Sequence, residues 1–167
     1  MRKIFINLLV CLILACNGCG DNALKKKQAD IADAIEKIPA SKIKLFLYSL
    51  DPKDQRFSGK PPENSDKIFH NYPILGSVEI IPVQEKESLL GAFAKGVREF
   101  HWPTACILEP RHGLRVVSDS GTNDFAICFK CGDVAAYGFS PAESFTTGNS
   151  RTVFDKFLDE YKLKKAE

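Results

Sequence analysis

The order of helix-like and strand-like segments is the feature that most constrains the fold of this chain. Apolar residues recur at helical spacing in three segments, namely 29–38, 85–100 and a stretch that begins near residue 150. Strand-like apolar runs occupy five others, namely 43–48, 74–81, 105–109, 114–118 and 125–137. Helices and strands do not alternate regularly, as parallel βαβ units would require. We therefore expect an α+β fold, with an antiparallel β-sheet packed against two or three helices.

Length and charge narrow the possibilities further. A chain of 167 residues has room for one domain rather than two well-formed cores. Its 23 basic and 21 acidic side chains leave a net charge of +2, without the strongly basic surface of a nucleic-acid-binding protein. We therefore expect no nucleic-acid partner.

The first residues differ from the rest of the chain. Arg2 and Lys3 form a short positive head, and the segment 4–14 is apolar except for Asn7. This apolar segment is shorter than the roughly 20 residues that a membrane-spanning helix needs. A positive head, a short apolar segment and a small residue before a cleavage site are typical of a secretory signal peptide. The sequence predicts that residues 1–15 are such a signal.

The sequence Ile13-Leu14-Ala15-Cys16 follows this apolar segment and resembles the lipobox of bacterial lipoproteins. Leu14 is larger than the residue usual at its position. The resemblance implies that Cys16 becomes the new N-terminus and carries a thioether-linked diacylglycerol, often with a third acyl chain on its amine. Two or more chains anchor a protein stably to a bilayer. In that family an aspartate after the cysteine commonly retains the protein at the inner membrane, so Asn17 favours the outer membrane in a cell with two.

Three parts of the chain follow from these features. We expect a cleaved signal (1–15), a lipidated cysteine with a flexible polar tether (16–30) and one α+β domain (31–167). Membrane attachment would then be through the lipid anchor, and the domain would lie outside the cytoplasm.

Three cysteines fall within the expected domain, namely Cys106, Cys128 and Cys131, and Cys19 lies in the tether. In an oxidising compartment paired cysteines are usually disulfides, which favours one disulfide plus a buried thiol. Cys106, His112, Cys128 and Cys131 together would also make a zinc-like ligand set. The CxxC spacing of Cys128 and Cys131 is shared by redox dithiols. A fourth possibility is a set of buried, unreactive cysteines.

Strand geometry tests these alternatives in part. If Gly121-Thr122 is the centre of a two-residue hairpin turn, His112 lies opposite Cys131 and Arg115 lies opposite Cys128. Side chains alternate between the faces of a strand, so Cys131 would point to the core face and Cys128 to the other. A turn or bulge near residues 129–130 would be needed to bring both sulfurs to one site.

Other side chains are expected to have structural roles. We expect Gly91 and Gly96 to allow close packing of helix 85–100 against the sheet, and His70 to be a packing residue without a polar partner. Thr152 and Asp155 have the spacing of a capping box at the start of the last helix.

A group of polar residues near the cysteines offers the best candidates for ligand binding: Glu109, Arg111, His112 and Arg115. The segments 106–115 and 127–131, with 45–52 and 74–76, are similar to a family of small exported bacterial proteins that has no assigned activity. No cofactor motif accompanies them. The sequence thus predicts a lipid-anchored cell-envelope protein whose small, non-enzymatic domain binds an envelope protein or a small ligand, or has a structural role. Metal binding and thiol chemistry are the alternatives.

Overall fold

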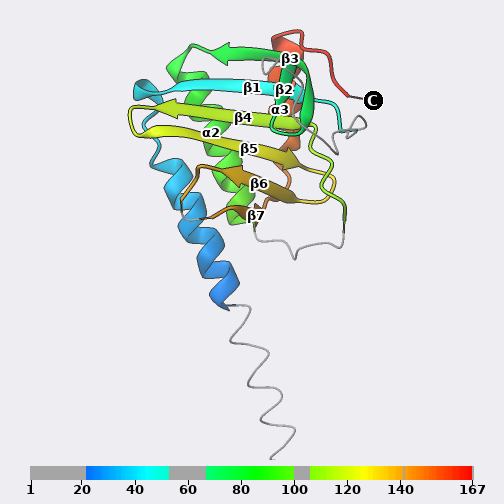
Figure 1. Cartoon of the computed structure of the whole chain (residues 1–167). Coiled ribbons are helices and arrows are strands. Elements are labelled where there is room, and N and C mark those ends of the chain that lie inside the picture. The colour runs from blue at the N-terminus through cyan, green and yellow to red at the C-terminus, as the bar shows by residue number, and fades with distance from the viewer. Residues whose placement is uncertain (1–21, 53–66, 100–105, 141, 167) are drawn as a thin grey trace, which may run out of the picture.

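The computed structural model describes residues 22–52, 67–99, 106–140 and 142–166. Within these residues a seven-stranded antiparallel sheet packs against helices, which confirms the predicted α+β fold (Figure 1). No helix in these four ranges is long and apolar enough to cross a membrane.

The elements follow the chain in this order: a helix over residues 22–36 (the N-terminal helix), η1 (Ala40–Lys42), β1 (Lys44–Leu50), β2 (Ile68–Phe69), β3 (Tyr72–Ile80), α2 (Val83–Arg98), β4 (His112–Ser118), β5 (Gly121–Cys128), β6 (Asp133–Tyr137), β7 (Ser144–Thr146) and α3 (Arg151–Glu160). Across the sheet the strands lie in the order β2-β3-β1-β4-β5-β6-β7. The N-terminal helix, α2 and α3 all contribute to the core on one face of this sheet.

The main core forms because alternate residues of the central strands point to the helix-covered face. The strands contribute fully buried Leu45, Leu47, Leu114, Phe125 and Ile127. The helices contribute buried aromatic and aliphatic residues at three- and four-residue steps: Ile31, Ile35, Leu89, Phe93, Val97, Phe154, Phe157 and Leu158. Burying each such side chain contributes about 1.5–3 kcal/mol. Predicted strands 43–48 and 74–81 and predicted helix 85–100 are confirmed within two residues.

The N-terminal helix is longer than predicted. It occupies residues 22–36, whereas the sequence predicted a flexible tether up to residue 30 and a helix only from residue 29. The segment contains Ala, Leu, Lys and Gln, which have high helix propensity. Gln28 is also buried and donates a hydrogen bond from Nε2 to the Thr146 carbonyl oxygen (3.0 Å). The helix is therefore fixed to the edge of the sheet at β7, and residues 16–21 of the expected tether lie outside the described residues.

Two strand predictions are wrong. The segment predicted as strand 105–109 has no regular secondary structure over residues 106–110, where Pro110 offers no backbone N–H to a ladder. The segment predicted as one strand over 125–137 is two strands, β5 and β6, joined by a turn at residues 129–132. Gly132 makes this turn possible because its φ of 71° is in the left-handed region that favours glycine.

The β4–β5 hairpin turns at Asp119-Ser120, two residues before the predicted centre. Ser118 pairs with Gly121, so His112 lies opposite Ile127 rather than Cys131, and Arg115 lies opposite Asp124. The error is an even number of residues, so it leaves the side chains of β4 and β5 on their predicted faces, whereas Cys131 lies in the turn after β5. Leu114 and Phe125 accordingly face the main core as expected.

The two glycines of α2 differ in their surroundings. A Cβ atom on Gly96 would lie 2.7 Å from the Thr147 hydroxyl oxygen and 2.8 Å from that of Ser150, whereas a Cβ atom on Gly91 would have no neighbour within 4 Å. Close packing is therefore confirmed at Gly96, against the segment before α3 rather than the sheet, and is absent at Gly91.

Candidate functional site

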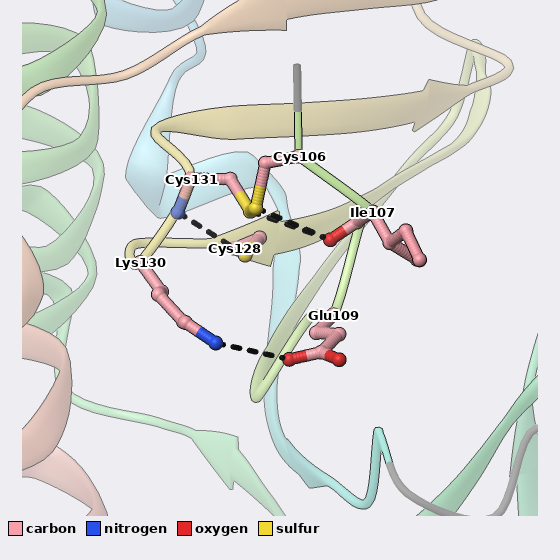
Figure 2. Close-up of a disulfide and its surroundings, with 6 residues drawn as sticks. All are labelled: Cys106, Ile107, Glu109, Cys128, Lys130 and Cys131. Carbon is pink, nitrogen blue, oxygen red and sulfur yellow. Dashed lines mark hydrogen bonds and ion pairs between the residues drawn. A yellow bond between two sulfur atoms is a disulfide. The ribbon is translucent and has the colours of Figure 1, made fainter. Parts of the chain in front are cut away.

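A disulfide joins Cys106 to Cys131, and Cys128 is a buried free thiol. This is the predicted combination of one disulfide and one buried cysteine. Figure 2 shows how the turn between β5 and β6 brings Cys131 to the segment that precedes β4. The backbone N–H of Cys131 points to Sγ of Cys128 at 3.4 Å. The disulfide thus closes the β4–β5 hairpin at its open end.

The predicted metal set does not assemble. Cys106 and Cys131 are bonded to each other, so neither offers a thiolate. Over the described ranges, no group of three or more His, Cys, Asp and Glu side chains is placed to hold a metal ion. His112 points instead to α3, where its Nε2 lies 2.9 Å from Oδ1 of Asp155.

The His112–Asp155 contact lowers the pKa of the Asp155 carboxyl group. The hydrogen bond with His112 is the main reason that the pKa of Asp155 falls to about 2, and the Arg151 guanidinium adds to the effect. Asp155 is therefore a carboxylate at neutral pH and accepts a hydrogen bond from the N–H group at Nε2 of His112. The capping box predicted for Thr152 and Asp155 is not formed, because α3 begins at Arg151 with Ser150 as its N-cap. The Asp155 carboxylate contacts His112 and Arg151 instead.

Two other candidate ligand-binding residues lie near the same end of the sheet. Glu109 pairs with Lys130 of the β5–β6 turn (3.5 Å), as Figure 2 shows. The Arg111 guanidinium donates a hydrogen bond to the Ala166 carbonyl oxygen at 3.2 Å, which ties the C-terminal segment to the start of β4. Neither contact brings its residue beside Arg115.

Arg115 lies on the opposite face of the sheet from His112. It donates two hydrogen bonds of 2.8 Å to Asp124, and Nε2 of His70 lies 2.9 Å from the same carboxylate. Burial acts to raise the pKa of Asp124, but the hydrogen bonds with Arg115 and His70 outweigh it and hold this pKa below its ordinary value. Of the four predicted ligand residues, Arg115 therefore lies across the sheet from His112, and the other two, Glu109 and Arg111, precede β4.

The prediction that His70 lacks a polar partner is wrong. Besides its contact with Asp124, the His70 ring stacks on Tyr137 at 3.6 Å between centroids. The neighbouring residue, Phe69, packs over Gly113. A Cβ atom on Gly113 would lie 3.2 Å from the Phe69 ring. The segment after residue 66 is thereby fixed across the face of the sheet that the helices leave uncovered.

The structure adds a site that the sequence did not indicate. A groove of about 310 Å³ lies between the N-terminal helix and the β6–β7 edge of the sheet. Its walls are mainly apolar and come from both elements and the segment before β4: Leu24, Ile31, Leu108, Val134, Ala135 and Phe145. Its polar lining consists of Lys27, Gln28, Asp133, Ser144 and Thr146. This volume is at the lower end of the range for small-molecule sites.

Two polar residues of this groove are in unusual states. Gln28 is only 5% exposed, and its Oε1 has no hydrogen-bond partner among the described residues. Burial raises the pKa of Asp133 above its ordinary value. Leu24, by contrast, is 42% exposed although it is a large apolar residue. Sequence reasoning missed the groove because residues up to 30 were assigned to a tether. The one available signal was the helix propensity of residues 23–29.

Comparisons with models of protein families, with curated proteins and with solved structures find no match to this chain.

Proposed function

We propose that the protein is a lipid-anchored protein of the cell envelope whose domain binds the acyl chain of a membrane lipid in the groove beside the N-terminal helix. The groove is the observation that carries the binding role. The lipobox-like sequence ending at Cys16 and the disulfide support the location.

Two independent features support the proposed location. Residues 1–15 have the organisation of a signal peptide, and Cys16 occupies the position that is lipidated in bacterial lipoproteins. The Cys106–Cys131 disulfide is the kind of bond that persists in oxidising compartments and is rare in the bacterial cytoplasm. In a cell with two membranes, Asn17 favours attachment to the outer membrane facing the periplasm.

The position of the groove supports an acyl chain as its occupant. Leu24 lines the groove and lies in the first turns of the N-terminal helix, close in sequence to Cys16. Even a fully extended chain spans at most about 3.6 Å per residue, so a lipid on Cys16 keeps this end of the domain within roughly 30 Å of the bilayer. Lys25, Lys26 and Lys27 beside it favour anionic head groups by about 1 kcal/mol each near the surface.

The anchor is tested by replacing Cys16 with serine and separating membranes from soluble fractions. We expect the wild-type protein in the membrane fraction, and the Cys16→Ser protein either unprocessed or released. Cys19→Ser is the matched control and should remain lipidated. A Cys16→Ser protein that has lost residues 1–15 and still attaches to membranes as firmly as the wild type would contradict the proposal.

The groove is tested with a photoactivatable fatty acid that cells incorporate into their lipids. After illumination, cross-links on the purified protein are expected in peptides of the N-terminal helix and β7. Leu24→Asn places a polar group in the groove and should reduce this labelling several-fold. Ile81→Asn is the control, because Ile81 is 73% exposed and does not line the groove. Absence of groove cross-links, or equal loss in both variants, would refute the acyl-chain assignment.

A further inference from the structure

A small cavity lies on the helix-covered side of the sheet, at the end where α3 meets β1 and β4. Its volume is about 30 Å³, and it is separate from the apolar groove. Its lining is mainly polar and charged: Ser49, Arg111, His112, Arg151, Asp155, Leu158, Lys165 and Ala166. Nothing in the proposed function uses these residues.

Two buried polar atoms on this lining have no hydrogen-bond partner among the described residues, namely Oγ of Ser49 and Nδ1 of His112. Ser49 is 0% exposed and His112 is 3% exposed. An unsatisfied buried polar group costs about 1–3 kcal/mol, so two at one cavity indicate a ligand that bonds to both.

The strand register places these two side chains together. Ser49 of β1 lies directly opposite His112 of β4, and the backbone N–H of Leu50 donates to the Arg111 carbonyl oxygen at 3.0 Å. That hydrogen bond makes Ser49 and His112 a non-hydrogen-bonded pair, in which Cα atoms are about 4.5 Å apart and side chains are closest. Both side chains therefore lie on the same face, beside the cavity.

The tautomer of the neutral His112 ring follows from the contact at its Nε2 atom. Asp155 is ionised, since its pKa is about 2, and lies 2.9 Å from Nε2 of His112. In neutral imidazole one ring nitrogen carries the proton and the other is an acceptor. With the proton on Nε2, Nδ1 is an acceptor, whereas the Ser49 hydroxyl can donate or accept.

Three cations also line the cavity, against the single carboxylate of Asp155. Arg111 donates to Ala166, Arg151 donates to Asp155, and Lys165 lies 2.6 Å from Asp159. The guanidinium of Arg111 has five N–H donors, so its contact with Ala166 uses only part of its capacity. The lining therefore carries an excess of positive charge together with one buried donor and one buried acceptor.

We propose that this cavity binds one small oxyanion that also carries a hydroxyl group, with hydrogen phosphate as the representative chemistry. Its oxygens would accept hydrogen bonds from Ser49 and the cations, and its O–H group would donate to Nδ1 of His112. A single water needs about 10–15 Å³ of such a cavity, so this one admits a ligand of only a few atoms and excludes a nucleotide or a sugar.

The test is thermal unfolding of the mature protein across a phosphate titration at constant ionic strength and pH 8. A ligand that binds only the folded state raises Tm, by about 3–6 °C at ten times Kd for a domain of this size. Ser49→Ala and Arg111→Gln should abolish most of this rise. Without phosphate, Ser49→Ala should unfold at the same or a higher temperature, because it removes an unsatisfied hydroxyl.

Adjacent lysines provide a charge-matched control. Lys165→Gln should reduce the phosphate-dependent rise, whereas Lys164→Gln should retain it, because Lys164 does not line the cavity. Sulfate has no hydroxyl to offer Nδ1 and should raise Tm less than phosphate does. Three results would each overturn the proposal. The wild-type Tm does not respond to phosphate, as expected for a cavity that holds only water. Alternatively, all variants respond equally to phosphate, or sulfate raises Tm as much as phosphate does.

Discussion

Breaking the Cys106–Cys131 disulfide is the perturbation whose size follows most directly from the connectivity of the chain. The bond joins residues separated by 25 positions, and the loop that it closes contains β4 and β5. Loop-closure entropy removed from the unfolded state gives about 3.5 kcal/mol of stability at 25 °C for a loop of this length. Residues 106–110 have no regular structure, so no β-ladder compensates when the bond is lost.

The assay is urea unfolding of the Cys106→Ala/Cys131→Ala double variant and of the wild-type protein, each with and without a reducing agent. We expect the double variant to lose about 3.5 kcal/mol of unfolding free energy, equivalent to roughly 7–14 °C in Tm. It should then be insensitive to reducing agent. Cys128→Ala is the control, because it keeps the disulfide and should remain sensitive.

A double variant as stable as the wild type would refute this reasoning. So would a Cys128→Ala variant that no longer responds to reducing agent, since that result would assign the stabilising bond to Cys128 instead.

Two further predictions concern α2 and α3. Gly96→Ala should destabilise the protein by about 1–3 kcal/mol, because its Cβ atom would lie 2.7 Å from the Thr147 hydroxyl oxygen. Gly91→Ala should stabilise it by roughly 0.5–1 kcal/mol, because a Cβ atom there would meet no neighbour within 4 Å. Equal effects of the two substitutions in urea unfolding would contradict both predictions. The pKa of Asp155 is lowered from 3.8 to about 2 by His112, so its stabilising contribution is complete above about pH 4 and is lost as the pH falls through 2. Asp155→Asn should lower the free energy of unfolding by about 1 kcal/mol at neutral pH, after allowance for solvent screening. This difference from the wild type should shrink below pH 4. A difference that stays constant down to pH 2 would show that the Asp155 carboxylate is not its source.

Much of the fold was predictable because apolar periodicity reports which side chains a strand or helix buries. Leu45 and Leu47 alternate with less buried residues, and Leu89, Phe93 and Val97 follow helical spacing, so both elements were found within two residues. The position of the turn between β4 and β5 was harder to predict. Several turn-forming residues are consecutive in 119–124, and their composition alone does not select which pair occupies the turn.

The polar sites were less predictable because their partners are far apart in the sequence. His112 meets Asp155 from α3, and His70 meets Asp124 from β5, at separations that no local pattern reports. Asp155 was assigned to a capping box because its spacing from Thr152 fits one. Among the cysteines, the combination of one disulfide and one thiol followed from redox chemistry. The pairing depended on a turn at 129–132, a segment whose sequence resembles a continuous strand.

The mass of the intact protein purified from membranes reports cleavage, lipidation and disulfide formation together. We expect a chain that begins at Cys16, carries the added mass of a diacylglyceryl group with or without a further acyl chain, and lacks two hydrogens because of one disulfide. A chain that retains residues 1–15, or a mature chain without lipid, would contradict it.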